Sequence, residues 1–460
     1  MVTNMYKHKN LITGSALLAF LWAGSALAAV SEQQAAALGQ ALTPVGAEPA
    51  GNADGRIPAW TGGLAKNAGT IDASGFMTDP YASDQPLFTI TAENAEQYRE
   101  HLSEGQLALF KRYPTTFKMP VYPSQRSAAF PDFWLQKTRD NATQVSLAGN
   151  GNTLQNYRMG VPFPLPQNGL EAIWNHMARY IGSTVKRNIL TAAPQASGQF
   201  TASLLDQDLA MQWALTDHDS AKSQNVLFYY KWRTLTPARL AGEVLLVHET
   251  LDQVKEPRLA WVYNAGQRRV RRAPQISYDG PSSTSDGQHT ADNFMMFNGA
   301  PDRYDWKLVG KSELYVPYNA YRLDDPKLKY ADIIKPGHIN PEYTRYELHR
   351  VWVVEANLKA GSRHIYAKRR FYLDEDTWQA LVVDHYDNRG QLWRVAEGHL
   401  QQVYQEQIPM ILVETCYDLL NGRYFVSGLR NEVRNAPQYG TVKMSSNDFS
   451  PSSLRQAGVR

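Results

Sequence analysis

The sequence contains a single cysteine, Cys416, among 460 residues. One cysteine cannot form a disulfide within the chain, so the fold must be held together by its own hydrophobic core. Cys416 lies in the apolar stretch IPMILVETCYDLL. We therefore expect it to be buried as a small hydrophobic residue, and we do not expect a catalytic thiol.

A large excess of charge of either sign is also missing. The chain has 47 Lys and Arg against 44 Asp and Glu, which gives a net charge of +3. Proteins that bind nucleic acid usually carry a strong basic excess on the binding surface. The near balance of charges therefore excludes nucleic acid from the partners that we expect.

Long apolar runs are scarce too. The strongest candidate for a membrane span is residues 11–22, but it is short and is interrupted by Thr, Gly and Ser. A basic start with Lys7 and Lys9 precedes this run, and AGSALA follows it. This three-part layout is typical of a secretory signal peptide. An uncleaved membrane anchor is the alternative interpretation.

The small residues Ala26 and Ala28 predict that signal peptidase cleaves after Ala28. The mature chain would then begin at Ala29, without the signal peptide of residues 1–28. The residue directly after the predicted cleavage site is Ala29 and not a cysteine, which excludes a lipoprotein anchor. An exported chain without disulfides favours the periplasm as its location.

Motifs of the common enzyme classes are absent from the sequence. HETLD (His248–Asp252) lacks the second histidine of a zinc-protease helix, and no nucleophile elbow, phosphate loop or dinucleotide fingerprint appears. His349 and His364 fall in two stretches that we expect to pair as strands, but a metal site needs three or four convergent ligands. We therefore interpret both as hydrogen-bonded sheet residues and predict no catalytic residue, metal ligand or cofactor.

From about residue 181 onward, segments rich in β-branched and aromatic residues alternate with turn signals. LDEDTW and DNRG (Asp387–Gly390) are predicted hairpin turns, and the acidic run 374–376 inside the first is interpreted as a solvated loop. Strands joined by short turns form an antiparallel meander, and about ten to twelve of them should curl into a half-barrel or barrel. The predicted fold is therefore α+β and β-rich, with a large curved antiparallel meander sheet closed by helices and long loops.

Residues 29–180 differ from the rest of the chain in composition and in the elements that they predict. The segment up to residue 90 is dense in Gly and Pro, and helices are expected at residues 31–39, 91–114 and 170–180. We predict that residues 29–180 form an irregular and helical N-terminal region packed on the sheet. Residues 181–460 are predicted to form the curved sheet domain with helical insertions.

Long stretches of the chain resemble a known family. Residues 239–274, 298–323 and 340–387, together with LTPVGAEPAGNADGRIPAWTGGL, are similar to the proteobacterial exported domain-of-unknown-function family thirteen-twenty-nine (DUF1329). This resemblance implies a fold like that of the outer-membrane lipoprotein-sorting LolA/LolB-like superfamily, a curved half-barrel around a hydrophobic cavity. It also implies a resistance-nodulation-division-type exporter and an outer-membrane companion as partners. It offers no catalytic residues.

Aromatic residues make up 11% of the chain, and many fall inside predicted strands. Core packing accounts for most residues of this kind. The alternative is that the side chains facing inward line a ligand cavity, because a half-barrel that its own side chains do not fill encloses a pocket. The candidates for this lining are Phe228, Tyr230, Trp232, Trp261, Tyr263, Trp352 and Trp378.

Four arginines follow the predicted turn in LAWVYNAGQRRVRR. The period of two along a strand places Arg269 and Arg271 on one face, and Arg268 and Arg272 on the other. One interpretation is a pair of solvated or salt-bridged strand faces. The other is that Arg269 and Arg271 contact an anionic head group at the rim of the cavity.

These features predict a periplasmic, non-enzymatic binding protein or carrier for a hydrophobic or lipid-like ligand in envelope transport. Two alternatives stay open. The first is an exported hydrolase or modifying enzyme that acts on an envelope lipid, which requires polar residues converging in a cavity. The second is a structural adaptor without a ligand, which requires a filled barrel.

Overall fold

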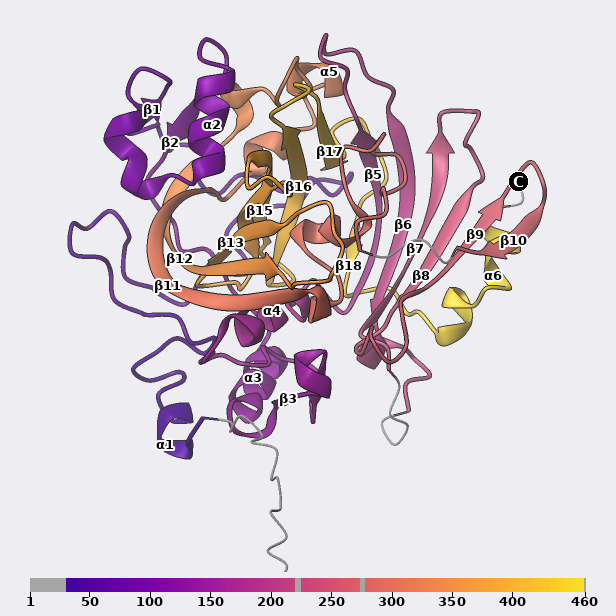
Figure 1. Ribbon diagram of the computed structural model, residues 1–460, viewed down its shortest axis with the longest axis horizontal. Coiled ribbons are helices and arrows are strands. Elements are labelled where there is room, and N and C mark those ends of the chain that lie inside the picture. Colours follow the sequence, from indigo (N-terminus) through magenta and orange to yellow (C-terminus); the bar gives the residue numbers. More distant parts are fainter. Residues whose placement is uncertain (1–29, 220–224, 274–277, 459–460) are drawn as a thin grey trace, which may run out of the picture.

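The computed structural model describes residues 30–219, 225–273 and 278–458 (Figure 1). The predicted signal peptide and its cleavage site lie outside these residues. Within them, no helix combines the length and the apolar composition that a membrane crossing requires.

Within the described residues, 16 strands form one large sheet, and β3 (Ser146–Ala148) and β4 (Thr153–Gln155) form a separate hairpin. The strands of the large sheet are β1 (Phe88–Ile90), β2 (Met119–Val121), β5 (Thr184–Ala192), β6 (Ser203–Met211), β7 (Phe228–Thr236), β8 (Val244–Glu249), β9 (Leu259–Asn264), β10 (Arg269–Arg272), β11 (Tyr304–Pro317), β12 (Tyr346–Leu358), β13 (Lys368–Asp374), β14 (Ala380–Tyr386), β15 (Leu392–Val403), β16 (Ile408–Asp418), β17 (Tyr424–Leu429) and β18 (Gln438–Tyr439).

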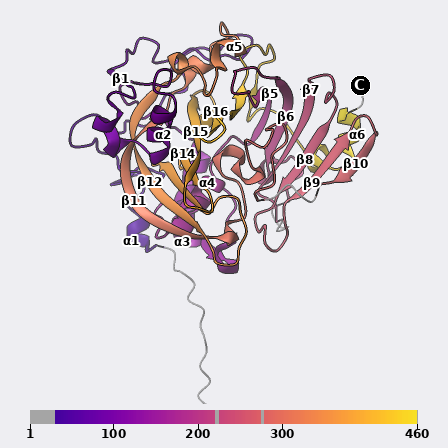
Figure 2. The ribbon, with the colours of Figure 1, turned by 45° about the horizontal axis from the view of Figure 1, so that its top comes forward.

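Two meanders build the large sheet. Strands β12 to β17 follow one another, strands β5 to β10 do the same, and the meanders meet where β17 pairs with β5. Neighbouring strands are antiparallel except at one parallel bridge between β2 and β12. Along the strand path the sheet ends at β10, beyond which the described part of the chain adds no strand (Figures 1 and 2). The predicted β-rich fold with a large, mostly antiparallel sheet is confirmed, and the sheet is not closed into a barrel.

The helices are short and lie between or after the strands. The α-helices are α1 (Glu32–Ala35), α2 (Glu104–Arg112), α3 (Asp132–Gln144), α4 (Gly169–Met177), α5 (Tyr330–Ile333) and α6 (Ser453–Gly458). The 3-10 helices are η1 (Ala95–His101), η2 (Gly149–Gly151), η3 (Gln212–Ala214), η4 (Ala291–Met296), η5 (Pro301–Arg303), η6 (Tyr321–Asp324), η7 (Pro341–Tyr343) and η8 (Ser446–Phe449).

The prediction of one helix over residues 91–114 is wrong, because two helices form there. Ser103 interrupts the segment in an extended conformation and caps α2, with its Oγ accepting a hydrogen bond from the Gln106 backbone N–H at 3.0 Å. The Ser103 hydroxyl also donates to Asp384 Oδ1 of β14 at 2.9 Å. This buried contact with the sheet fixes the break in the helix, and it depends on a residue far away in the sequence. The expected helix at residues 170–180 is present as α4.

Different parts of the chain cover the two faces of the sheet. We call the face that carries Tyr230 and Phe371 the inner face, and it packs against α3 and α4 through Trp134 and Trp174. The opposite, outer face packs against α2 on one side of the molecule and against α6 at the β9 end (Figure 1). Cys416 is buried on the inner face as predicted, and burial raises the pKa of its thiol to about 12.

Candidate functional site

A pocket opens on the inner face where the two meanders meet. Its floor is formed by strands β5 to β8, β16 and β17, and residues 281–295 lie over it as a covering loop. The cavity volume is about 80 Å³, and the space free of protein atoms reaches about 880 Å³ only when open solvent at the mouth is included. Its apolar lining consists of Ile189, Leu205, Tyr230, Trp232, Leu245, Ala291, Phe294, Met295, Ile411, Leu412 and Phe425. The lining is that of a site for an apolar group.

The covering loop is held against the sheet by packing and by hydrogen bonds. The ring of Phe294 in η4 stacks on Tyr230 of β7, with centroids 4.8 Å apart and planes at 18°. The Thr191 and Thr284 hydroxyls lie 2.9 Å apart and join β5 to the loop. The Glu414 carboxylate accepts the Met295 backbone N–H at 3.1 Å. The pocket is therefore bounded by a fixed loop and a rigid sheet.

One cation, Arg187, lies in the wall of this pocket. The strand alternation of β5 puts Arg187 on the same face as Ile189 and Thr191, and the residue is only 8% exposed. Its Nε donates to Gln207 Oε1 at 2.8 Å, and its Nη1 lies 3.3 Å from the Met410 sulfur. Among the residues that the structure describes, no carboxylate forms an ion pair with it. A buried guanidinium without a counter-ion, beside an apolar pocket, is suited to bind an anionic group.

A chain of three polar residues also reaches the pocket. Ser282 Oγ lies 3.0 Å from His289 Nδ1, and His289 Nε2 lies 2.8 Å from Glu414 Oε1. A carboxylate only accepts, so the ring proton is on Nε2 and Nδ1 accepts the Ser282 hydroxyl proton. His289 and Glu414 are buried, whereas Ser282 is partly exposed at the pocket. The order of the groups, hydroxyl to imidazole to carboxylate, is that of an activated serine.

The structure brings only some of the predicted aromatic residues to this pocket. Tyr230 and Trp232 line it, and Phe228 lies on the same face of β7 within the core. Trp352 and Trp378 stack on each other elsewhere in the inner-face core, with centroids 6.1 Å apart.

Trp261 and Tyr263 face the other way. The register of β8 and β9 pairs Trp261 with Leu246 and places both aromatic residues on the outer face, where they pack with Leu454 of α6. The predicted hairpin itself is present as β9 and β10. Its alternation sends Val262, not its aromatic residues, to the inner face.

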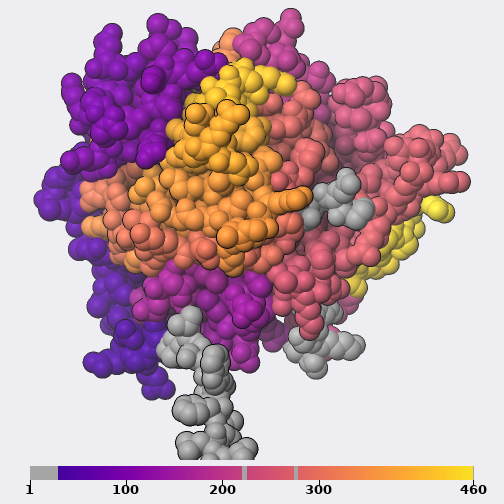
Figure 3. Space-filling view, in the orientation of Figure 1, coloured from indigo at the N-terminus to yellow at the C-terminus, as the bar shows by residue number. Residues whose placement is uncertain are grey.

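Arg269 and Arg271 are exposed on β10, which is the last strand of the sheet path. Neither residue is part of the pocket wall. The β9–β10 hairpin and the C-terminal helix project at one side of the molecule (Figure 3). Arg268 lies in the turn with a φ of 51°, so the strand begins only at Arg269.

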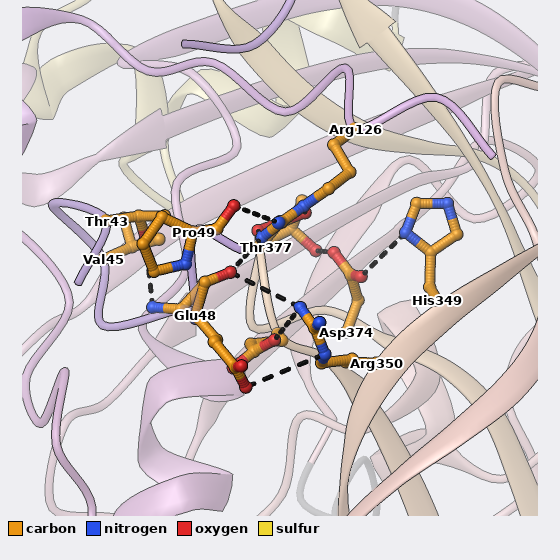
Figure 4. A network of polar contacts seen from close by, with 12 residues as sticks. Thr43, Val45, Glu48, Pro49, Arg126, His349, Arg350, Asp374 and Thr377 are labelled. Carbon is orange, nitrogen blue, oxygen red and sulfur yellow. Dashed lines mark hydrogen bonds and ion pairs between the residues drawn. The ribbon is translucent and has the colours of Figure 1, made fainter. Parts of the chain in front are cut away.

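A second polar cluster is buried at the turn between β13 and β14. The prediction that Asp374, Glu375 and Asp376 form a solvated loop is wrong, since none is more than 4% exposed. The Glu48 backbone N–H donates to Glu375 Oε1 at 3.0 Å, and Arg126 holds Asp376 with two hydrogen bonds of 2.8 and 2.7 Å. The N-terminal segment closes over the turn and supplies these partners (Figure 4).

Arg126 links this turn to the N-terminal segment. It also donates to the Glu48 carbonyl at 2.9 Å and to the Pro49 carbonyl at 3.3 Å. Trp378 donates its Nε1–H to the Val45 carbonyl at 3.0 Å. The turn is therefore fixed by backbone groups that lie more than 300 positions away in the chain.

His349 lies at the centre of the cluster. Its Nδ1 is 3.8 Å from Asp374 Oδ1 (Figure 4). Its Nε2 is 3.1 Å from Glu347 Oε2, and its ring stacks on that of Tyr318. Asp374 Oδ2 accepts the Thr377 hydroxyl at 2.7 Å and the Tyr318 hydroxyl at 3.3 Å. Within the described residues, Asp374 Oδ1 has no hydrogen-bond donor. Burial, with the charge of Asp376 beside it, raises the pKa of Asp374 to about 7.

The two histidines considered as a metal pair are far apart. Strands β12 and β13 do pair as expected, but His349 lies next to the β13–β14 turn, and His364 precedes β13 at the opposite end of the hairpin. His364 instead lies 3.0 Å from Asp292, which is also paired with Arg369. The register of the hairpin therefore rules out a site shared by these two residues.

Sequence reasoning missed Arg187 and the chain formed by Ser282, His289 and Glu414. These residues come from β5, from an irregular loop and from β16, so their meeting depends on the pairing of β17 with β5. No local pattern signals that pairing. For Arg187, the sequence gives one indication of a site, which is an arginine on the inner face of an otherwise apolar strand.

Comparison with known proteins gives a family and several similar structures. The model of the family described as protein of unknown function (DUF1329) matches residues 89–455. The chain is 58% identical to an uncharacterized protein of Pseudomonas aeruginosa over 452 residues, which is 98% of this chain and 99% of that protein.

Two solved structures are similar at low identity. A DUF1329 family protein of Desulfovibrio piger matches with 14% identity and a TM-score of 0.41, over 59% of this chain and 92% of that one. A putative outer membrane lipoprotein-sorting protein domain of Vibrio parahaemolyticus matches with 15% identity and a TM-score of 0.43, over 62% of this chain and 98% of that one.

Proposed function

The chain belongs to the DUF1329 family, and we propose that it is a periplasmic binding protein, or carrier, for a hydrophobic, lipid-like ligand with an anionic end. The observation that carries this proposal is the apolar inner-face pocket with the buried Arg187 in its wall, which forms no ion pair with any carboxylate of the described residues. We propose a non-enzymatic role, in which the protein shields the ligand from water during envelope transport.

Binding would follow from desolvation and from one charged contact. An apolar chain that enters the pocket gains about 0.8 kcal/mol for each CH₂ group removed from water. Arg187 would donate charge-assisted hydrogen bonds to a carboxylate or phosphate at the end of that chain. Its Nε is already held by Gln207, so the guanidinium is oriented before the ligand arrives.

The proposed setting is the periplasm, on the basis of the signal peptide predicted over residues 1–28. As partners we propose an inner-membrane exporter of the resistance-nodulation-division type and an outer-membrane companion, which the family resemblance implies. The carrier would pass its ligand between the two membranes.

A second candidate function is an exported hydrolase that acts on an envelope lipid. The observation that favours it is the hydrogen-bonded chain of Ser282, His289 and Glu414 at the pocket. Ser282 Oγ would attack an ester carbonyl while His289 Nδ1 takes its proton, and His289 would then protonate the leaving alcohol. Water would hydrolyse the resulting acyl-serine.

Native mass spectrometry and lipid extraction of the full chain, purified from the periplasm, test the proposal. We expect bound lipid in the wild-type chain and in Leu204→Trp, whose side chain lies on the outer face, but not in Leu205→Trp, which fills the pocket. Thermal melting checks that both variants fold. Repeated absence of lipid from the wild type would contradict a carrier. Ester turnover that is lost in Ser282→Ala would favour the hydrolase.

A further inference from the structure

The cluster at the β13–β14 turn contains three side chains with metal-binding donor atoms. His349, Asp374 and Asp376 each offer one such atom, these atoms lie within 4.8 Å of one another, and all three residues are buried. His349 comes from β12, whereas the two aspartates come from the end of β13 and from the turn. None of the three belongs to the inner-face pocket.

Asp374 differs from the other buried carboxylates of this cluster. Glu375 is paired with Lys311, Asp376 with Arg126 and Glu347 with Arg345. Within the described residues, neither lysine nor arginine forms an ion pair with Asp374, and its Oδ1 has no hydrogen-bond donor. The residue is 1% exposed. A carboxylate buried in this way requires a proton or a cation for its neutralisation.

His349 is oriented as a ligand would be. Because the Glu347 carboxylate can only accept, the hydrogen bond at Nε2 places a ring proton there, and in the neutral imidazole the Nδ1 lone pair is then directed at Asp374 Oδ1. A carboxylate that holds the far nitrogen of a histidine is the usual outer partner of a metal-bound imidazole. The Tyr318 ring, stacked at 3.8 Å between centroids, fixes the plane of the imidazole.

The spacing fits an ion better than a direct contact. The separation of 3.8 Å between His349 Nδ1 and Asp374 Oδ1 is too long for a hydrogen bond. Two donors that each lie about 2.1 Å from one zinc ion are at most about 4.2 Å apart. An ion between these two atoms therefore requires only small side-chain movements.

We propose that His349 Nδ1, Asp374 Oδ1 and a carboxylate oxygen of Asp376 bind one divalent transition-metal ion of the zinc class, with a water molecule as the fourth ligand. One imidazole and two carboxylates are a donor set that such ions accept. The site is structural, because all three residues are buried and Arg126 connects Asp376 to the N-terminal segment. Asp376 is the weakest donor of the three, since Arg126 already binds both of its oxygens.

Elemental analysis and native mass spectrometry of the purified full chain, produced with added zinc, test this site. We expect close to one zinc ion per wild-type chain, and at least a tenfold lower content in Asp374→Asn and in His349→Phe, which retains the stack on Tyr318. His218→Phe is the matched control, because the His218 ring contacts Arg158 and Gln212 instead. Asp376→Asn should show an intermediate loss.

A second measurement uses the wild-type chain alone, so it does not depend on whether a variant folds. A chelator should lower the melting temperature of the wild-type chain, and added zinc alone should restore it. A wild-type chain that is free of zinc and takes up none, or zinc content that is equal in the wild type, Asp374→Asn and His349→Phe, would overturn the proposal. In that case a proton neutralises Asp374.

Discussion

Replacement of Arg187 by methionine separates a binding role of this residue from a structural one. In the folded chain, the guanidinium is buried, donates to Gln207 and has no carboxylate partner among the described residues. The lost hydrogen bond to a charged group removes about 1.5–3 kcal/mol. Relief from burying a charge that has no carboxylate partner among the described residues returns several kcal/mol, so the free energy of unfolding should not fall and should rise by up to a few kcal/mol.

Ligand binding should change far more. A charge-assisted contact between Arg187 and a carboxylate in a pocket of low polarity contributes about 2–3 kcal/mol, which corresponds to roughly 30- to 150-fold in affinity. We therefore expect Arg187→Met to bind palmitate at least about 30-fold more weakly than the wild type. Hexadecanol, which has the same chain length without the charge, should bind both proteins equally.

Displacement of a fluorescent fatty acid by palmitate or hexadecanol measures both affinities. Lys186→Met is the matched control, because this neighbouring lysine is exposed and pairs with Asp208 on the opposite face. Equal palmitate affinity in Arg187→Met and the wild type would refute the assignment of Arg187. So would an equal loss of affinity for palmitate and for hexadecanol, because such a loss indicates a collapsed pocket.

Three further predictions concern stability. Trp378→Ala should lower the free energy of unfolding by about 3–5 kcal/mol in denaturant titrations, because the ring is fully buried and its Nε1–H donates to the Val45 carbonyl. Trp378→Phe should lower it less, and an equally small loss of stability in both variants would contradict this packing. Arg126→Met should destabilise the chain by about 3–5 kcal/mol, because it leaves Asp376 buried and unpaired, and a loss below about 1 kcal/mol would mean that the pair is dispensable. Burial raises the pKa of Asp384 from 3.8 to about 7, so the free energy of unfolding of the wild type should fall as the pH rises from about 4 to 7. In denaturant titrations, Asp384→Asn should be as stable as the wild type at pH 4 and more stable at pH 8, by of the order of 2–4 kcal/mol. Equal stability of the two proteins at pH 8 would contradict the shift.

The sequence predicts the local elements of this fold well, because they depend on neighbouring residues. Both hairpin turns in the β13–β15 region and the turn before Arg269 lie where the turn residues indicate. The junction of β17 with β5 could not be predicted, since it joins strands from the end and the middle of the chain. The pocket lies at this junction, and its polar residues were missed for the same reason.

Burial of charge was the other feature that the sequence did not predict. A run of three acids in a turn is typical of a solvated loop, and residues 374–376 are buried only because Arg126 and Glu48 close over them. The aromatic residues show what strand alternation cannot predict. The alternation identifies which residues of β7 share a face, but only the register of β9 with β8 places Trp261 and Tyr263 on the outer face.

Photo-crosslinking with a diazirine-labelled fatty acid tests the central claim most directly, because it locates the ligand on the full-length chain. If the inner-face pocket is the binding site, peptide mapping by mass spectrometry should find the adducts on pocket residues such as Tyr230, Phe294 and Ile411, and excess palmitate should remove them. Adducts on the β9–β10 hairpin around Trp261 and Arg271, or adducts that palmitate does not displace, would contradict the account.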